Sequence, residues 1–239
     1  AEGDGFDVHA LCPLFVLIDL FCHPADVVEG VFWNAHAGKR RVGEMSAQAE
    51  GLGGSSLYGQ ADYPNIKLFD DAIAASGLGA FSHTELEKAL AGKIATASMS
   101  LSSQRQYING SSTPQDVETL LQLVYLHFTA INKDQASYDN LMRTAEIALK
   151  NKALSPDNAF ADSLNATLNS HNPRFASPTV DDLKHVSYDR ILEMARELTA
   201  NAAAYTFTFV GNFDEAKLRP LIEQYIASLP AKAEVGARA

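Results

Sequence analysis

The sequence has few basic residues and no long apolar run. Its 19 lysines and arginines stand against 29 aspartates and glutamates, so the formal net charge is -10 at pH 7. Nucleic acids are bound by clustered Lys and Arg, so this charge disfavours a nucleic-acid partner. The most apolar stretch near the start is LFVLIDL, residues 14–20, far short of the roughly 20 residues that cross a bilayer. It follows acidic residues, not a basic segment, so neither a membrane span nor a targeting signal is expected.

Cysteine is also scarce, with Cys12 and Cys22 flanking that apolar run. If the run is an extended strand, ten steps separate the two residues by about 33 Å. A disulfide needs Cα atoms within about 7 Å, so two buried free thiols are favoured over a bridge, which stays the alternative. Two cysteines without a third ligand also make a poor zinc site. They do not fix the redox compartment.

The overall composition is that of a globular protein. Of the 239 residues 46% are hydrophobic and 20% are charged, enough for the core of one large or two small domains. The AEG start and the weak tail, residues 231–239, suggest a piece of a longer protein.

The strongest local pattern is a strand, a turn and a helix in residues 204–230, AYTFTFVGNFDEAKLRPLIEQYIASLP. Aromatic residues alternate with Thr and Val from Tyr205 to Val210, which predicts a buried strand. Gly211 then predicts a turn, and Asp214 predicts an N-cap. Apolar residues recur on one face of the helix that follows, in which Pro220 predicts a kink or a fresh first turn.

The other elements follow from periodicity and capping. Strands are predicted over residues 14–21, 27–37, 94–101 and 104–108, and helices over 65–76, 85–91, 113–129, 133–152, 155–170, a short turn from 179, and 187–198. The helix over 113–129 is the most apolar and is expected to lie flat on a sheet. Helix and strand signals do not simply alternate, which disfavours a doubly wound parallel sheet. We predict an α/β fold of α+β type, a two-layer sandwich with a mostly antiparallel sheet and helices packed on one face.

Several helix ends carry specific signals. Capping residues or cap-plus-proline pairs precede five helices, at Ser82 with Glu85, Thr113 with Pro114, Ser155 with Pro156, Thr179 with Asp182, and Ser187. Gly77 and Gly92 are expected to end the helices over 65–76 and 85–91.

A Gly- and Ser-rich stretch, GLGGSSLYGQ at residues 51–60, is expected to be a loop. Its backbone N–H groups are a possible anion cradle. It lacks the GxxxxGK[ST] and GxGxxG spacings, so a plain loop is favoured over a phosphate site.

The histidines do not form a metal motif. HExxH, HxxEH and HxH are all absent around His9, His23, His36, His83, His127, His171 and His185. His83 and Glu87 lie four positions apart, but with no third ligand nearby an exposed pair is favoured over a zinc site. His127 is expected to be a partly buried surface histidine.

No catalytic nucleophile or acid–base pair is evident. GxSxG is absent, and neither cysteine adjoins a plausible base. The pairs Asp70–Asp71 and Asp181–Asp182 are better explained by helix dipoles and solubility than by acid–base work. Arg174 lies in a Pro- and Ser-containing loop, where holding a carboxylate is one role and an exposed loop arginine the favoured alternative.

The order of several segments resembles the insulinase/pitrilysin family of zinc metalloproteases, especially bacterial two-half proteins described as periplasmic zinc proteases. The segments are TPQDVETLLQL from Thr113, HNPR from His171, TVDDLK from Thr179, FVGNFD from Phe209, LRPLIE from Leu218 and SLP from Ser228. The resemblance implies a LuxS/MPP-like metallohydrolase fold. It divides the chain into a lead-in of uncertain structure at 1–26, a single insulinase-family α/β unit at 27–230 and a tail at 231–239.

The resemblance also implies where zinc would be held. Such proteins have two homologous halves that close around a peptide, and HxxEH in the first half binds zinc and activates water. By analogy the motif falls in the helix over 65–76, which has no histidine. Lys67, Asp70 and Asp71 cannot replace a His/His/Glu set. The chain therefore resembles the first unit of the second, non-catalytic half, with no catalytic or metal residue, no cofactor of its own, and unknown substrate-binding residues.

The expected function is a non-catalytic structural and substrate-enclosing domain, inactive alone. Its expected partners are the catalytic zinc-binding half of the same polypeptide, or a homologous subunit, and a peptide substrate in the bacterial periplasm. Two alternatives stay open: a scaffold or assembly subunit without a proteolytic role, and an unrelated hydrolase whose site is not visible. An HxxEH motif upstream of Ala1 would favour the protease over the scaffold.

Overall fold

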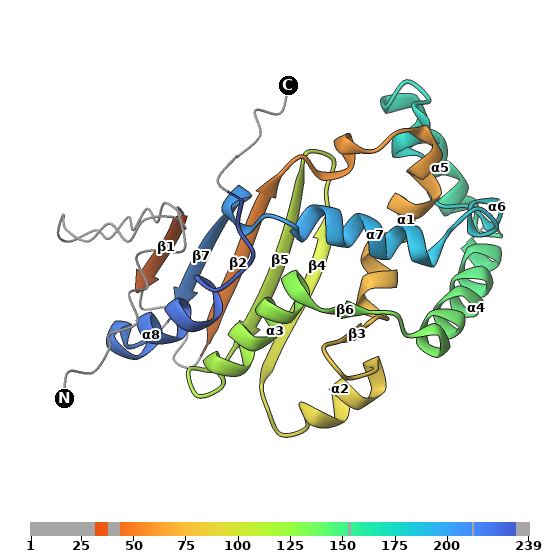
Figure 1. The fold of residues 1–239 in the computed structure, drawn as a ribbon. Helices are drawn as coiled ribbons and strands as arrows, with labels where there is room; N and C mark the ends of the chain where they lie inside the picture. Colours follow the sequence, from red (N-terminus) through yellow and green to blue (C-terminus); the bar gives the residue numbers. More distant parts are fainter. Residues whose placement is uncertain (1–31, 38–43, 153, 212, 233–239) are drawn as a thin grey trace, which may run out of the picture.

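The computed structural model describes residues 32–37, 44–152, 154–211 and 213–232, with the backbone alone at 32–37 (Figure 1). The predictions for Cys12, Cys22, His9 and His23 lie outside these residues. So do the predicted strand over 14–21, the lead-in, and the tail from 233.

A five-stranded sheet in the order β1-β7-β2-β5-β4 organises the described part of the chain. β1 runs parallel to β7, and the other neighbours are antiparallel, so the predicted mostly antiparallel sheet is confirmed (Figure 1). β3 and β6 form a separate antiparallel pair. The strands are β1 Phe32–Ala37, β2 Met45–Leu52, β3 Gly77–Leu78, β4 Ala95–Leu101, β5 Arg105–Ser112, β6 Ile131–Asn132 and β7 Tyr205–Gly211.

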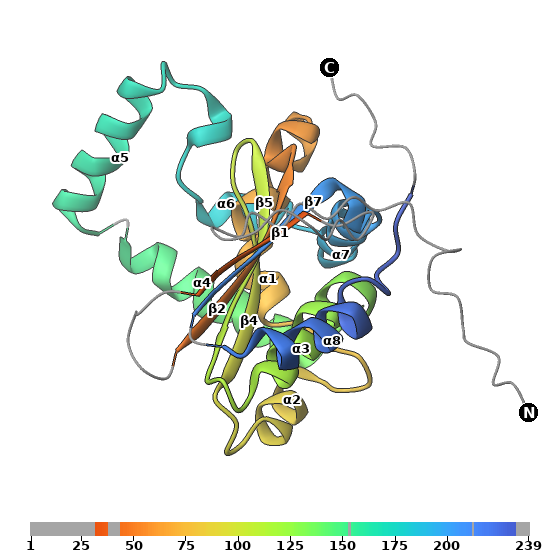
Figure 2. The same cartoon turned by 90° about the vertical axis from the view of Figure 1, so that its left-hand side faces the viewer.

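Helices form the second layer, with α3, α7 and α8 together on one side of the sheet in Figure 2. α1 contacts β4 and α7, whereas α4 and α5 extend beyond the β4 edge (Figure 1). The α-helices are α1 Tyr63–Ala74, α2 His83–Ala89, α3 Val117–Thr129, α4 Gln135–Lys152, α5 Pro156–Leu168, α6 Val180–Leu183, α7 Tyr188–Thr199 and α8 Glu215–Tyr225. The short 3-10 turns are η2 Gly54–Leu57, η3 Gln60–Asp62, η4 Pro173–Phe175 and η5 Ala202–Ala204.

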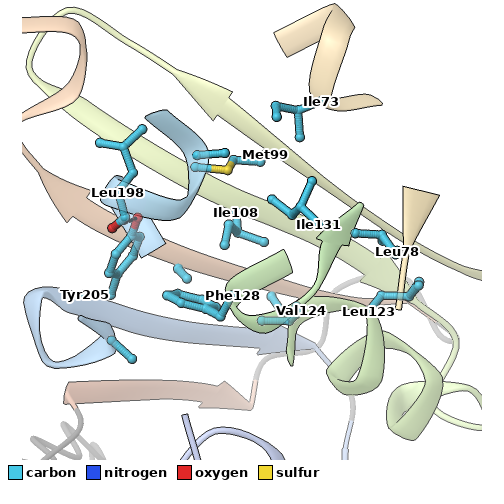
Figure 3. Close-up of a cluster of buried hydrophobic side chains, with 14 of the residues drawn as sticks. Ile73, Leu78, Met99, Ile108, Leu123, Val124, Phe128, Ile131, Leu198 and Tyr205 are labelled. Carbon is cyan, nitrogen blue, oxygen red and sulfur yellow. Dashed lines mark hydrogen bonds between the residues drawn. The ribbon is translucent and has the colours of Figure 1, made fainter. Parts of the chain in front are cut away.

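The core lies between the sheet and these helices. Tyr205, Phe207 and Phe209 alternate along β7 and are buried, as predicted. The ring of Phe128 on α3 packs edge-on against Tyr205, with 4.9 Å between ring centroids (Figure 3). α3 contacts β4 and β5, so the prediction that it lies on the sheet is confirmed. Burial of aromatic side chains on this scale makes the β7–α3 contact a large contribution to stability.

Most capping predictions are confirmed by side-chain hydrogen bonds. Ser82 with Glu85 and Thr179 with Asp182 form reciprocal capping boxes. Asp214, Ser155 and Ser187 each accept a hydrogen bond from a backbone N–H of the first turn. α8 passes through Pro220 as a single helix, not two.

Three local predictions are corrected. α3 begins at Val117 with Asp116 as its N-cap residue, and Thr113 lies in the preceding turn, where its hydroxyl donates to the Asp116 carboxylate. Gly77 belongs to β3; the positive φ of 62° occurs at Gly79. β2 was not predicted and takes in Gly51, the first residue of the predicted loop.

Candidate functional site

α1 is the helix predicted to correspond to the metal motif. Its polar side chains Lys67 and Asp70 form contacts with other elements of this chain. Lys67 Nζ lies 3.0 Å from Asp182 Oδ2 on α6. Asp70 Oδ1 accepts a hydrogen bond from the Leu101 N–H at 2.9 Å. Burial raises the pKa of Asp70, an effect that this hydrogen bond partly offsets. These residues position α1 against α6 and β4.

The Gly- and Ser-rich segment after β2 is held by the rest of the chain, so it is not a free anion cradle. The N–H groups of Gly53, Ser55 and Ser56 donate to backbone carbonyls that follow β4, and the Gly54 N–H donates to the Gln106 side chain at 2.8 Å. A nest binds an anion only when its N–H groups are free to point at it. The plain-loop prediction fits this geometry.

Arg174 has a different role from either predicted one. Its Nη1 donates to the Ser55 carbonyl and its Nη2 to the Tyr58 carbonyl, the latter at 2.9 Å. The guanidinium also lies over the Tyr63 ring, 4.9 Å from its centroid. Arg174 is therefore half-buried and holds backbone carbonyls of the loop, so the expectation of an exposed loop arginine is wrong.

A second arginine cluster ties α7 to η3. Arg190 forms a fork on Asp62, with Nε and Nη2 each 3.2 Å from a carboxylate oxygen, and its Nη1 also binds Glu193 and Glu197. Burial, and then the charge of Glu197, raise the pKa of the nearby Tyr58 hydroxyl. Tyr58 thus stays protonated and donates to the Met194 carbonyl. Shifted pKa values mark many active sites, but here they describe a structural network. Sequence reasoning missed it because the partners lie far apart in the chain.

The two histidines singled out from the sequence lie on neighbouring elements, α2 and α3. His83 Nε2 is 3.6 Å from Glu87 Oε1 in an exposed pair, as expected. His127 is not a surface residue: it is 5% exposed, and its Nδ1 lies 2.8 Å from the Leu123 carbonyl oxygen. Burial lowers the pKa of His127, so the ring is neutral near pH 7.

The described residues do not fit a zinc ion. No group of three or more His, Cys, Asp or Glu side chains gathers in this part of the chain. Asp181 and Asp182, the second predicted carboxylate pair, serve α6 through Lys184 and Thr179. In the described ranges no helix is long and apolar enough to cross a membrane.

The face of the sheet opposite α3 and α7 carries mostly uncharged polar side chains, with the charged pair Glu50 and Arg105 among them. Gln48 Nε2 donates to Asn109 Oδ1 at 2.9 Å, joining β2 to β5, and Thr96 and Ser111 share a hydrogen bond at 3.1 Å. Antiparallel sheets commonly bury one face and leave the other in water, and the alternating burial of β2 and β7 has this form. This open polar face comprises Ser46, Gln48, Thr96, Ser98, Tyr107, Asn109, Ser111, Thr206 and Thr208.

Solved proteases share this architecture. The periplasmic protease PqqL from Escherichia coli superimposes with a TM-score of 0.68 at 22% identity, over 84% of this chain and 22% of that one. The ferredoxin protease FusC, solved with Arabidopsis ferredoxin, gives 0.64 at 16% identity over 89% of this chain and 23% of that one. A Helicobacter pylori protease gives 0.68 at 12% identity over 86% and 50% of the two chains.

A curated relative points the same way. The protein "Zinc protease PQQL-like" from Arabidopsis thaliana is 30% identical over 117 residues, 48% of this chain and 12% of that protein. The chain resembles insulinase-type zinc proteases. No protein-family model matches the sequence. The chain spans 12% of the curated relative and between 22% and 50% of the three solved chains, so it corresponds to one part of them. The LuxS/MPP-like label stays a prediction.

Proposed function

We propose that this chain is a non-catalytic structural and substrate-enclosing domain of an insulinase-type zinc metalloprotease. The proposal rests on the side-chain contacts of α1, the helix expected to correspond to the zinc motif, within a fold that solved proteases share. Lys67 and Asp70 are engaged with Asp182 and with the Leu101 N–H, so they hold elements together. The sequence has no HxxEH, the motif that supplies zinc ligands in such proteases. Zinc chemistry would then come from another half of the protein.

The open polar face of the sheet is suited to be a wall of the substrate chamber. Its side chains are mostly hydroxyls and amides, which accept and donate hydrogen bonds without imposing a charge. Such a surface can contact peptides of varied sequence while it remains hydrated. Glu50 lies on this face opposite Tyr107 and Thr206, and it is paired with Arg105, so its charge is balanced.

The exposed apolar side of α5 is evidence for a further domain that contacts this chain. Phe160, Leu164 and Leu168 are four residues apart and thus share one face, and they are 71%, 47% and 75% exposed. The opposite side is polar: Asp162 contacts Lys152 and Ser177. None of the described residues of α5 is buried. This inverts the usual pattern, in which a surface helix turns its apolar stripe toward the core.

We name Phe160, Leu164 and Leu168 the α5 stripe and assign its cover to the catalytic half of the same polypeptide, or to a homologous subunit. Solved proteases of the same fold are two or more times as long as the matched region. They therefore contain further domains of the kind that would cover the α5 stripe. Exposed apolar patches rimmed by polar residues commonly mark such interfaces. The substrate would be a peptide, and the compartment would be the bacterial periplasm, the location that the name of the E. coli protease gives for that protein.

A scaffold subunit without a proteolytic role is the second candidate, because the α5 stripe would serve it equally well. The experiment uses the full-length protein that carries this chain, with Phe160, Leu164 and Leu168 all changed to Ser. The matched control changes three exposed α5 residues, Ala159, Ala161 and Thr167, to Ser.

The protease proposal predicts chelator-sensitive peptide hydrolysis that the stripe variant loses and the control keeps, with the far-ultraviolet circular dichroism unchanged. Hydrolysis that is absent from the wild type, together with lost subunit assembly in the stripe variant, would favour the scaffold. Equal activity in both variants would remove the partner assignment.

A further inference from the structure

β4 is the last strand of the sheet in the described ranges, so it is paired with β5 on one side and has an outer edge on the other. In an antiparallel pair, alternate residues direct their N–H and C=O groups to the partner strand, and the residues between them direct theirs away. The Thr113 N–H donates to the Ile94 carbonyl in register with this pairing, so the even-numbered residues of β4 are the ones that bond β5. The residues whose backbone groups point to the outer edge are Ala95, Ala97, Met99 and Leu101.

The outer edge of β4 is largely unpaired. The Leu101 N–H donates to Asp70 Oδ1 on α1 at 2.9 Å. For the outward groups of Ala95, Ala97 and Met99, no hydrogen-bond partner lies among the described residues. Ala95 and Met99 are 5% and 2% exposed, so water has limited access to their backbone groups. Shielded backbone groups without partners are unfavourable, so this edge is suited to bind hydrogen-bonding groups from outside the chain.

A partly open cavity of about 190 Å³ lies along this outer edge. Four consecutive residues of β4, at 95–98, line it, although successive side chains of a strand point to opposite faces of the sheet. The cavity therefore borders the strand edge itself, where the backbone groups of Ala95 and Ala97 point. Thr96 and Ser98 belong to the open polar face, so the cavity meets the proposed chamber wall at this border.

The helix side of the cavity is mainly aliphatic. Ile73 from α1, Leu78 from β3 and Leu123 from α3 are buried there (Figure 3). Ser76 and His127 also line this side, and each hydrogen bonds to a carbonyl of its own helix region. An apolar protein cavity of about 150 Å³ holds one benzene molecule, so this cavity has room for one apolar side chain.

We propose that the outer edge of β4 binds an extended peptide, which adds as a further antiparallel strand and places one leucine-sized side chain in the cavity. The peptide residue opposite Ala97 donates its N–H to the Ala97 carbonyl and accepts from the Ala97 N–H. Its side chain lies on the same side of the sheet as that of Ala97, which packs against the core. The aliphatic part of the cavity is on that side, so a single peptide residue makes both kinds of contact.

The flanking helices favour a single peptide over the sheet edge of a folded domain. α1 lies against β4, and His83, Leu86, Glu87 and Leu90 line the cavity from α2. A folded domain would bring its own sheet against these helices, whereas one extended segment needs only the space between them. The inference rests on the proposed substrate-enclosing role, because a peptide at β4 lies beside the chamber wall.

The test is a titration of the ¹⁵N-labelled 239-residue chain with three blocked peptides, followed by NMR. The first peptide is acetyl-TTLTT-amide, the second has serine in place of the leucine, and the third has a methyl group on the leucine nitrogen. The amide resonances of Ala95 and Ala97 should shift saturably with the first peptide. Loss of the leucine side chain should weaken binding roughly 10-fold or more, and loss of one hydrogen bond should weaken it roughly 2- to 12-fold.

Variants of the chain test the two parts of the site separately. Ala97→Pro removes the outward N–H but no bond to β5, as proline on an edge strand can, and it should weaken the leucine peptide. Ala74→Leu, at the exposed mouth of the cavity, should also weaken it, whereas Ala136→Leu, on exposed α4, should not. If Ala97→Pro does not fold, the three peptides with the wild-type chain still decide.

Equal affinity of the leucine and serine peptides, or no saturable shift at Ala95 and Ala97, would overturn the proposal. The titration contains neither zinc nor a catalytic half. A negative result would therefore remove this site alone, and the proposed function would still be decided by the experiments with chelator and with the α5 stripe.

Discussion

Lys67 Nζ on α1 lies 3.0 Å from Asp182 Oδ2 on α6, although the two residues are 115 positions apart. The side chains are 11% and 18% exposed. Asp182 also accepts from the N–H and the hydroxyl of Thr179. Burial opposes ionisation of Asp182, but these hydrogen bonds and Lys67 outweigh it and lower its pKa. One ion pair thus joins a capping box to the helix that we expected to correspond to the metal motif.

Replacing Lys67 by Met should destabilise the chain by about 1.5–3 kcal/mol, the usual worth of a partly buried hydrogen bond to a charged group. The measurement is urea unfolding followed by circular dichroism. Lys217→Met is the control, because the Lys217 side chain is 84% exposed, and its effect should stay within about 0.5 kcal/mol. Equal effects of the two substitutions would mean that the α1–α6 pair contributes no stability.

Arg174→Lys should loosen the segment from Gly53 to Tyr58 while keeping the charge. Lysine has no planar fork, so it cannot donate to the Ser55 and Tyr58 carbonyls together. Hydrogen–deuterium exchange should speed up in this segment and remain unchanged in α3. Arg143→Lys, at an exposed position on α4, is the control. Unchanged protection of the segment in Arg174→Lys would show that the fork does not hold the loop.

Gly110→Ala should destabilise the sheet through a steric clash. A Cβ at Gly110 on β5 would lie 2.4 Å from Leu120 Cδ1 and 2.7 Å from the Thr96 carbonyl oxygen. Overpacking of this kind costs about 1–3 kcal/mol. Gly59→Ala is the matched control, because nothing lies within 4 Å of its added Cβ. Thermal unfolding should separate the two variants clearly; similar midpoints would contradict the packing of α3 on β5.

His127 should make stability depend on pH in the range where histidines titrate. Burial lowers its pKa in the folded state, so below the ordinary value of about 6.5 the unfolded chain binds a proton that the folded chain does not. The free energy of unfolding should therefore fall as pH drops from about 7.5 to about 5.5. The fall should be smaller in His127→Leu and unchanged in His185→Gln, which alters an exposed histidine. A wild-type curve that is flat over this range would contradict the burial of a neutral ring.

The sequence predicted elements whose signals are local. Capping boxes at Ser82 and Thr179 and the alternating aromatics from Tyr205 involve contacts within a few residues, and all are present in the structure. β2 was missed because its buried face is Met45, Ala47 and Ala49, and alanine is a weak strand signal beside polar Ser and Gln. The strand exists because β5 and β7 pair with both of its edges.

The site could be predicted less well, because its contacts are long-range. Arg174 finds its partners 119 and 116 positions away, which no local pattern indicates. His127 was placed at the surface, but it lies on the face of α3 that carries Leu123 and Leu120 into the core. Only the pairing of β2 with β5 brings Gln48 to Asn109 on the open polar face.

The most direct test of the non-catalytic role is made on the 239-residue chain itself. Zinc is titrated by calorimetry, and the zinc-treated chain is then incubated with a quenched fluorogenic peptide with and without chelator. We predict no saturable zinc binding and no chelator-sensitive hydrolysis. One zinc ion held tightly per chain, together with hydrolysis that the chelator stops, would contradict the account.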